Sequence, residues 1–198
     1  MTTRQLTEIK EFAKAYYQRN DQFHQWSHAL LTVKYARMLA KQYKNVSLQI
    51  LDAACYLHDI GRVNKDDGHP EESVRLARPF LKRIGLSPEE IKLIIHAVEI
   101  HAKERIKAAK TIEAKLLFDS DKIQILSVYG FIRVYSFLIV VRKWEMERAL
   151  NFMWDYVQSV HKDYIQTPLA KKILDPEMKH IEKIVSSFKK GLEGKLDA

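Results

Sequence analysis

The chain has 198 residues, 46% of them hydrophobic and 29% charged, which suffices for one buried core and excludes a disordered or low-complexity protein. A single cysteine, Cys55, excludes an internal disulfide framework and fits a reducing compartment. The formal net charge of +8 suits phosphate-bearing partners, from nucleotides to nucleic acid, but the basic residues are spread along the chain and form no recognition motif.

Low glycine and proline contents, 6 and 5 residues, predict an all-α fold. We expect one domain over residues 1–198, with a core at about 20–140 and C-terminal helices at about 142–192 packing on it. Residues 2–14 are polar and charged, unlike a signal peptide. Residues 123–141 approach the length of a membrane span, but Arg133 would be costly at mid-membrane, so two buried helices meeting near Gly130 are expected. We therefore expect a soluble, cytoplasmic protein.

The first predicted helices cover residues 3–19 and 27–43, and a third begins after the capping residue Ser47. His28 lies on the apolar face of the second helix and His58 on that of the third. One inward histidine is usually a hydrogen-bonded core residue. Two of them beside Asp59 favour a site for a divalent cation, because imidazole and carboxylate both offer lone pairs.

The residues after Asp59 predict a turn and a new helix. Gly61 is expected to end the third helix in a left-handed turn, and a charged loop at 63–68 follows. His69 and the proline after it open a helix to about residue 84, with a kink or a break at Pro79.

Ser87-Pro88-Glu89-Glu90 is a complete capping box and starts the next helix. On that helix His101 shares the apolar face and is the inward candidate, whereas His96 points away and is expected at the surface.

A long apolar helix from Thr111 onward carries Asp119 and Asp121. A buried carboxylate without a partner is costly, so a metal ion or a basic group is expected beside them, and periodicity does not choose between the two aspartates. The rest of the chain, amphipathic at 142–165 and with helix starts at Thr167-Pro168 and Asp175-Pro176, offers no catalytic pattern.

In chain order, His28, then His58-Asp59, then His101, then an aspartate resembles the H…HD…D pattern of the HD superfamily of metal-dependent phosphohydrolases. Residues 57–62, Leu-His-Asp-Ile-Gly-Arg, are similar to its LHDIG[KR] signature. Further segments that resemble motifs of the superfamily, or of its small stand-alone hydrolases, are 69–73, 97–101, 113–122 and 129–133. The resemblance covers about residues 20–190 and implies a single HD-domain helical bundle with a C-terminal helical extension.

The resemblance also implies roles for particular residues. The implied metal ligands are His28, His58, Asp59 and Asp121, with Asp119 as a structural acid. Such mixed nitrogen and oxygen donors suit Mn, Mg, Fe, Co, Ni or Zn. The catalytic candidates are Asp59, Arg62, His69 and His101. The substrate-binding candidates are Arg62, Lys65, Lys122 and Arg133. If these side chains take no part in the reaction, ion pairing or helix capping is their ordinary role. His69 and His101 could hold phosphate, transfer protons or bind a second metal.

We predict a metal-dependent phosphohydrolase that releases phosphate or pyrophosphate from a small phosphorylated metabolite. By analogy with the family, the expected substrate is a nucleotide. The alternative is a nucleotide-sensing or nucleic-acid-binding module with little or no turnover. Ala102 stands where dinuclear HD-GYP phosphodiesterases carry a second histidine, and their GYP segment is missing, so the resemblance does not extend to cyclic dinucleotide cleavage. No membrane partner is expected, nucleic acid is not favoured, and self-association is left open.

Overall fold

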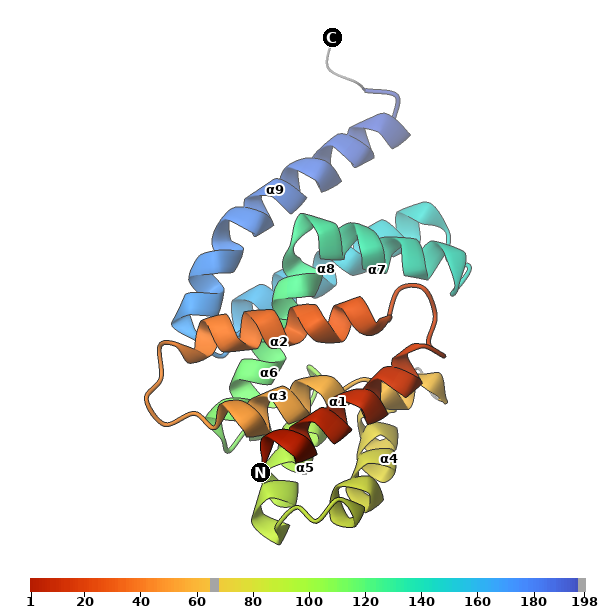
Figure 1. The fold of residues 1–198 in the computed structure, drawn as a ribbon. Helices are drawn as coiled ribbons and strands as arrows, with labels where there is room; N and C mark the ends of the chain where they lie inside the picture. Colours follow the sequence, from red (N-terminus) through yellow and green to blue (C-terminus); the bar gives the residue numbers. More distant parts are fainter. Residues whose placement is uncertain (65–67, 196–198) are drawn as a thin grey trace. The chain divides into compact units, whose positions relative to one another are not determined.

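The computed structural model describes residues 1–64 and 68–195. Over these residues the chain contains nine α-helices, two short 3-10 turns and no strand, which confirms the predicted all-α fold (Figure 1). The elements are α1 (Thr3–Tyr17), α2 (Trp26–Ala40), α3 (Leu48–Leu57), η1 (Ile60–Val63), α4 (His69–Arg83), α5 (Pro88–Ile100), η2 (Ile106–Ala108), α6 (Ile112–Leu126), α7 (Val128–Val140), α8 (Met146–Asp163) and α9 (Pro168–Leu192).

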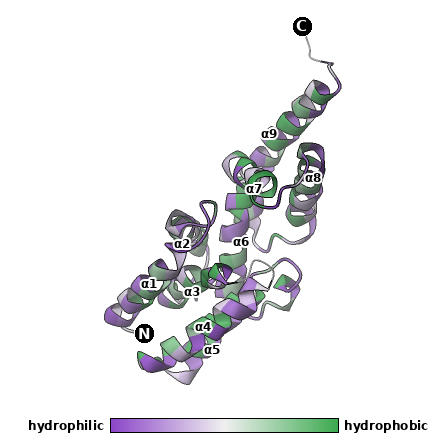
Figure 2. Cartoon of the chain, turned by 90° about the vertical axis from the view of Figure 1, so that its right-hand side faces the viewer, coloured by the Kyte–Doolittle hydropathy of each residue, from purple (hydrophilic) through white to green (hydrophobic). Residues whose placement is uncertain are grey.

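The helices form two compact units, Met1–Asp121 and Lys122–Ala198, and α6 continues from the first into the second. The single domain expected from the sequence, with a core ending near residue 140, stays a prediction. Figure 2 shows hydrophobic and hydrophilic residues along the same helices, α4 and α9 among them, as in helices that bury one face.

Helix α3 is the central element of the first unit, where α1, α2 and α5 pack against it. Every residue from Ile50 to Leu57 is buried, which explains why this segment is nearly continuously apolar. The helix starts at the predicted cap, because the Ser47 hydroxyl accepts a hydrogen bond from the Ile50 amide. It ends at Leu57, with His58 as its C-cap, so the candidate ligands follow a rigid buried helix.

Gly61 does not adopt the left-handed conformation that the sequence predicted. The glycines with positive φ in the described residues are Gly68, Gly85 and Gly194. Instead, a Cβ at Gly61 would lie 2.4 Å from the His69 carbonyl oxygen and 2.5 Å from the Ser73 amide nitrogen. The first turn of α4 therefore packs directly on η1, and only glycine permits this approach.

Two prolines, Pro79 and Pro176, lie inside helices. Helix α4 has no break at Pro79, and α9 continues through Pro176, where a helix start was expected. A proline removes one backbone hydrogen bond, a loss that packing on both sides of it can offset. Asp175 caps no helix; its Oδ1 lies 2.9 Å from Nε2 of His161 on α8.

In the second unit, α7, α8 and α9 pack on one another. The break between α6 and α7 falls at Ser127, close to the predicted junction at Gly130. A Cβ at Gly130 would lie 1.2 Å from the Gln124 carbonyl oxygen, so glycine is required for the sharp turn. The prediction that both helices are buried is wrong for α7, because Tyr129 and Ile132 are 63% and 51% exposed.

Among the described helices, none is by itself long and apolar enough to cross a membrane. Helices α6 and α7 reach that length and composition only as a pair, and they are bent by 77° where they meet. The expected cytoplasmic location stays a prediction.

Candidate metal centre

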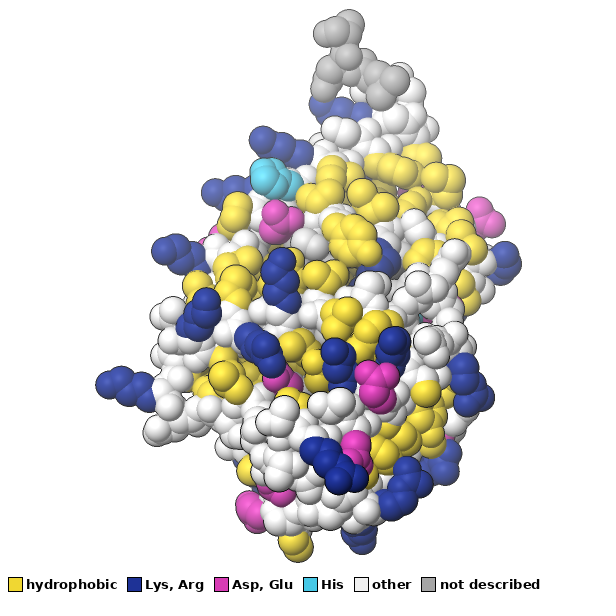
Figure 3. Space-filling model, in the orientation of Figure 1, with side chains coloured by type: hydrophobic (Ala, Val, Ile, Leu, Met, Phe, Trp, Pro, Cys, Tyr) yellow, Lys and Arg dark blue, Asp and Glu magenta, His cyan; other side chains and the backbone are white. Residues whose placement is uncertain are grey.

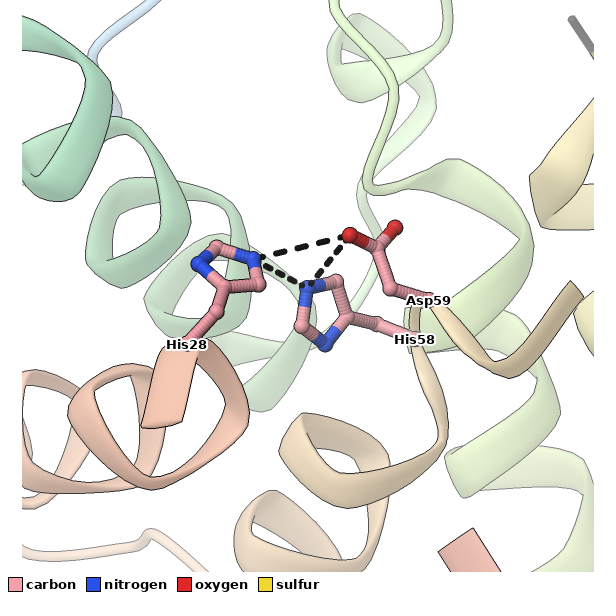
Figure 4. Close-up of side chains that lie close together, drawn as sticks. All are labelled: His28, His58 and Asp59. Atoms are coloured by element: carbon pink, nitrogen blue, oxygen red, sulfur yellow. Dashed lines mark hydrogen bonds and ion pairs between the residues drawn. The ribbon is translucent and has the colours of Figure 1, made fainter. Parts of the chain in front are cut away.

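Three side chains converge where α3 ends (Figure 4). His28 comes from α2, His58 is the C-cap of α3, and Asp59 follows it. The Nε2 atoms of the two histidines lie 3.2 Å apart. Oδ2 of Asp59 lies 3.5 Å from Nε2 of His28 and 3.6 Å from Nε2 of His58. All three side chains are buried, and one ion could receive a donor atom from each.

His58 presents a lone pair to this cluster. Its Nδ1 lies 2.8 Å from the Cys55 carbonyl oxygen, which can only accept a hydrogen bond, so Nδ1 carries the proton. Burial lowers the pKa of His58 from its ordinary 6.5 to about 3, although the charge of Asp59 opposes the shift. Its Nε2 is therefore an unprotonated donor atom at neutral pH.

A second group of donor atoms surrounds the other oxygen of Asp59. Nε2 of His69, at the start of α4, lies 3.1 Å from Oδ1 of Asp59, and Nε2 of His101 lies 3.5 Å from the same oxygen. The two Nε2 atoms are 3.1 Å apart. Nδ1 of His101 donates to the Val98 carbonyl oxygen at 2.6 Å, which directs Nε2 to the cluster. Asp59 thus belongs to two groups that could each hold an ion.

Arg62 keeps the Asp59 carboxylate ionised. Burial raises the pKa of Asp59, but the charge of Arg62 opposes this effect most strongly, and the pKa lies well below its usual range. Nε of Arg62 lies 2.8 Å from Oδ2 of Asp59, and its Nη2 lies 3.2 Å from Nε2 of His69. Arg62, predicted to act in catalysis and substrate binding, therefore contacts both groups of donors.

Asp121 reaches the first group from α6. Its Oδ1 lies 3.3 Å from Nε2 of His28, and its side chain is buried. Asp119 is also buried on α6. The position of Asp121 beside His28 supports Asp121 as the last ligand, an assignment that stays a proposal.

A serine on α4 holds the turn that carries these residues. The Ser73 hydroxyl donates to the His58 carbonyl oxygen at 2.7 Å and accepts from the Gly61 amide at 2.9 Å. Both hydrogen bonds are buried, so the hydroxyl joins the end of α3 to η1. The motif that contains Ser73 was noted in the sequence, but this role of its hydroxyl needs the tertiary contact.

The other predicted substrate-binding residues are Lys65, Lys122 and Arg133. Lys65 lies outside the described residues. Lys122 is buried on α6, and Arg133 is half-buried on α7; both belong to the second unit. Their predicted contacts with substrate stay proposals.

Sequence reasoning missed His24, which is buried near the first group. Its Nδ1 lies 2.9 Å from Oδ2 of Asp21, and its ring meets that of His28 edge-on, with centroids 6.4 Å apart. Burial, more than any other effect, lowers the pKa of His24, while Arg62 and Asp59 also influence it. Helical periodicity gave no signal for it, because His24 precedes Gln25, the N-cap of α2.

The donor set fits a divalent cation. Each imidazole pair brings two Nε2 atoms to within 3.2 Å of one another beside a buried, ionised carboxylate. Lone pairs facing one another at this distance repel unless a cation or a shared proton lies between them. Imidazole and carboxylate together suit Zn, Mn, Fe, Co or Ni, and the carboxylates also suit Mg.

A sequence model of the HD domain matches residues 26–126. A structure from Lactobacillus plantarum is 18% identical, with a TM-score of 0.82, over 98% of this chain and 99% of that one. An HD-superfamily hydrolase from Bacillus thuringiensis is 19% identical, with a TM-score of 0.70, over 96% and 97%. Bacillus subtilis YpgQ, solved in complex with ADP, is 17% identical, with a TM-score of 0.74, over 96% and 99%.

No curated protein matches the sequence significantly. At identities of 17–19% the solved structures show a shared fold. The HD-domain match extends over residues 26–126, half of the chain, and includes His28, His58, Asp59 and Asp121. By this match the chain belongs to the HD domain family.

Proposed function

We propose that the protein is a metal-dependent phosphohydrolase that acts on a small phosphorylated metabolite, a nucleotide in the first instance. The observation that carries this proposal is the buried carboxylate of Asp59, which has two imidazole nitrogens near each of its oxygens, at 3.1–3.6 Å. A structural core has no need of four imidazoles around one charge, whereas an ion-dependent hydrolase does.

His28, His58, Asp59 and Asp121 would hold the catalytic ion. When bound there, a divalent cation polarises a phosphoryl oxygen and lowers the pKa of a water molecule. Asp59 supplies a carboxylate whose charge is preserved by the Arg62 guanidinium 2.8 Å away. His58 supplies an unprotonated Nε2, because its Nδ1 proton is donated to the Cys55 carbonyl oxygen.

Arg62, His69 and His101 would receive the substrate phosphate or a second ion. The Arg62 side chain is 20% exposed, more than that of His69, so it can both pair with Asp59 and meet an anion from solvent. Arginine suits the planar, multiply charged face of a phosphoryl group. His69 and His101 offer nitrogens that can accept or deliver a proton during cleavage of the ester.

The choice of a nucleotide rests on one comparison. Bacillus subtilis YpgQ, which shares the fold, was solved with ADP. The distribution of charge on the surface also favours a small anionic substrate. Figure 3 shows lysine and arginine side chains scattered over the face in view, with acidic side chains among them. A nucleic-acid-binding protein gathers such charges into a stripe or patch.

The test is hydrolysis by protein stripped with EDTA and reloaded with Mn, Mg, Co or Ni. Nucleoside mono-, di- and triphosphates are offered, and phosphate and pyrophosphate are measured separately. We expect metal-dependent release that falls by more than about 100-fold in Asp59→Asn, beyond the loss typical of groups that only orient a ligand. Asp155→Asn, an exposed carboxylate on α8, is the matched control and should retain activity.

Two results would contradict the proposal. If wild-type protein binds the metals but releases nothing from any nucleotide, and calorimetry shows that it binds ADP, the protein is a nucleotide sensor. If Asp59→Asn releases phosphate as fast as wild type, the activity belongs to another site or to a contaminant.

A further inference from the structure

A tyrosine from outside the HD-domain match contacts the candidate metal site from behind. Tyr17 is at the end of α1, nine residues before the match begins at residue 26. Its side chain is only 1% exposed, and α1 packs on both α3 and η1, the elements on either side of Asp59. The Tyr17 ring also meets the Trp26 ring edge-on, with centroids 5.7 Å apart, which fixes its orientation.

The Tyr17 hydroxyl lies 3.4 Å from Nδ1 of His58, the nitrogen that faces away from Asp59. Nδ1 must carry a proton, because the Cys55 carbonyl oxygen at 2.8 Å can only accept. The tyrosine oxygen is therefore a second acceptor for the same proton. Two acceptors on Nδ1 fix the imidazole tautomer and the ring angle, so that Nε2 keeps its lone pair for an ion.

The hydroxyl approaches the ligand from the side of α1, which packs on the end of α3 and on η1. Ser73 holds the same turn through the His58 carbonyl oxygen and the Gly61 amide.

We propose that Tyr17 is a positioning residue that fixes the His58 imidazole for ion binding, which makes α1 part of the metal site. This inference rests on the metal site of the proposed function and does not depend on the substrate. It extends the functional unit beyond the HD-domain match to a helix that carries none of the ligands.

The test compares Tyr17→Phe with Tyr16→Phe, a neighbouring tyrosine on the same helix that is partly exposed. Each variant removes one hydroxyl and keeps the ring. Affinity for Co²⁺ is measured by visible absorption, and thermal stability is measured on metal-free protein. The Nδ1–H signal of His58 is observed by NMR in metal-free protein, assigned by its loss in His58→Gln.

We expect Co²⁺ affinity to fall about tenfold in Tyr17→Phe, the lower end of the range for groups that orient a ligand, because the 3.4 Å contact is long. The His58 Nδ1–H signal should shift or broaden, and Tyr16→Phe should match wild type in both measurements. Unchanged Co²⁺ affinity in Tyr17→Phe would overturn the inference. So would a loss of affinity accompanied by an unaltered His58 signal and a lower melting temperature, since that pattern belongs to a purely structural role.

The outcomes also separate this inference from the proposed hydrolysis. If wild type binds Co²⁺, Tyr17→Phe binds it more weakly and no nucleotide is hydrolysed, the positioning role stands and the proposed function fails. If nucleotides are hydrolysed and Tyr17→Phe binds Co²⁺ as tightly as Tyr16→Phe and wild type do, the proposed function stands and the positioning role fails.

Discussion

Nε2 of His69 lies 3.1 Å from Oδ1 of Asp59, on the opposite carboxylate oxygen from the one that faces His28. One carboxylate therefore joins donors from α4 and α5 on one side to donors from α2 and α3 on the other. This geometry allows the two groups to be perturbed separately, since only Asp59 is shared.

The first prediction separates the groups with single glutamine substitutions. His28→Gln should weaken the binding of the tightest Co²⁺ ion by more than about tenfold, because it removes a direct donor. His101→Gln should leave that ion in place and remove binding at the second group. Calorimetric titration measures the affinity and the stoichiometry of each variant. His96→Gln, on the same helix as His101 and half-buried, serves as the control. Equal effects of His28→Gln and His101→Gln would show that the donors act as one site.

A second prediction concerns pH and the metal-free protein. Burial lowers the folded-state pKa of His58 to about 3 from 6.5, so between these values the unfolded chain binds more protons than the folded chain. Stability should therefore fall as pH decreases from about 6.5 towards 3, with His58 contributing up to about 1.4 kcal/mol per pH unit.

Urea unfolding at pH 7, 6 and 5 measures this dependence. His58→Gln cannot titrate and should flatten the slope, whereas His180→Gln, an exposed histidine on α9, should not. Parallel slopes in wild type and His58→Gln would show that His58 does not carry the effect.

The third prediction tests the serine that joins α3 to η1. Ser73→Ala removes a fully buried hydroxyl that serves the His58 carbonyl oxygen and the Gly61 amide. Leaving both groups unsatisfied should cost about 1–3 kcal/mol of unfolding free energy and should weaken Co²⁺ binding as well. Ser186→Ala, an exposed serine on α9, should change neither quantity. Full stability in Ser73→Ala would mean that water replaces the hydroxyl.

The fourth prediction separates folding from function. Asp52 is 1% exposed on α3, and Arg37 from α2 approaches its carboxylate with Nε at 3.0 Å and Nη2 at 2.5 Å. Arg37→Met should cost about 2 kcal/mol, less than for a fully enclosed pair, because the Arg37 side chain is 55% exposed. Co²⁺ affinity should be unchanged, and Lys34→Met, an exposed cation on the same helix, should be neutral in chemical unfolding. A loss of Co²⁺ affinity in Arg37→Met would contradict this separation.

The sequence by itself located most of the helices and identified three histidines that face inward. Apolar periodicity of 3.6 residues assigned His28, His58 and His101 to buried faces, and all three are buried. The capping boxes and proline positions located helix starts such as Ser87 correctly, since a cap depends on local backbone geometry. Pro176 failed as the signal for a helix start, because tertiary packing can keep a helix continuous through a proline.

Only the tertiary structure decided which of these residues meet. Periodicity could not choose between Asp119 and Asp121, because the choice depends on how α6 is rotated towards His28. The role of Gly61 is likewise a contact between segments, the approach of α4 to η1, and not a turn preference that a single position reveals. The contribution of Tyr17 arises because α1 packs across the end of α3, and distances between segments 41 residues apart are set by the core as a whole.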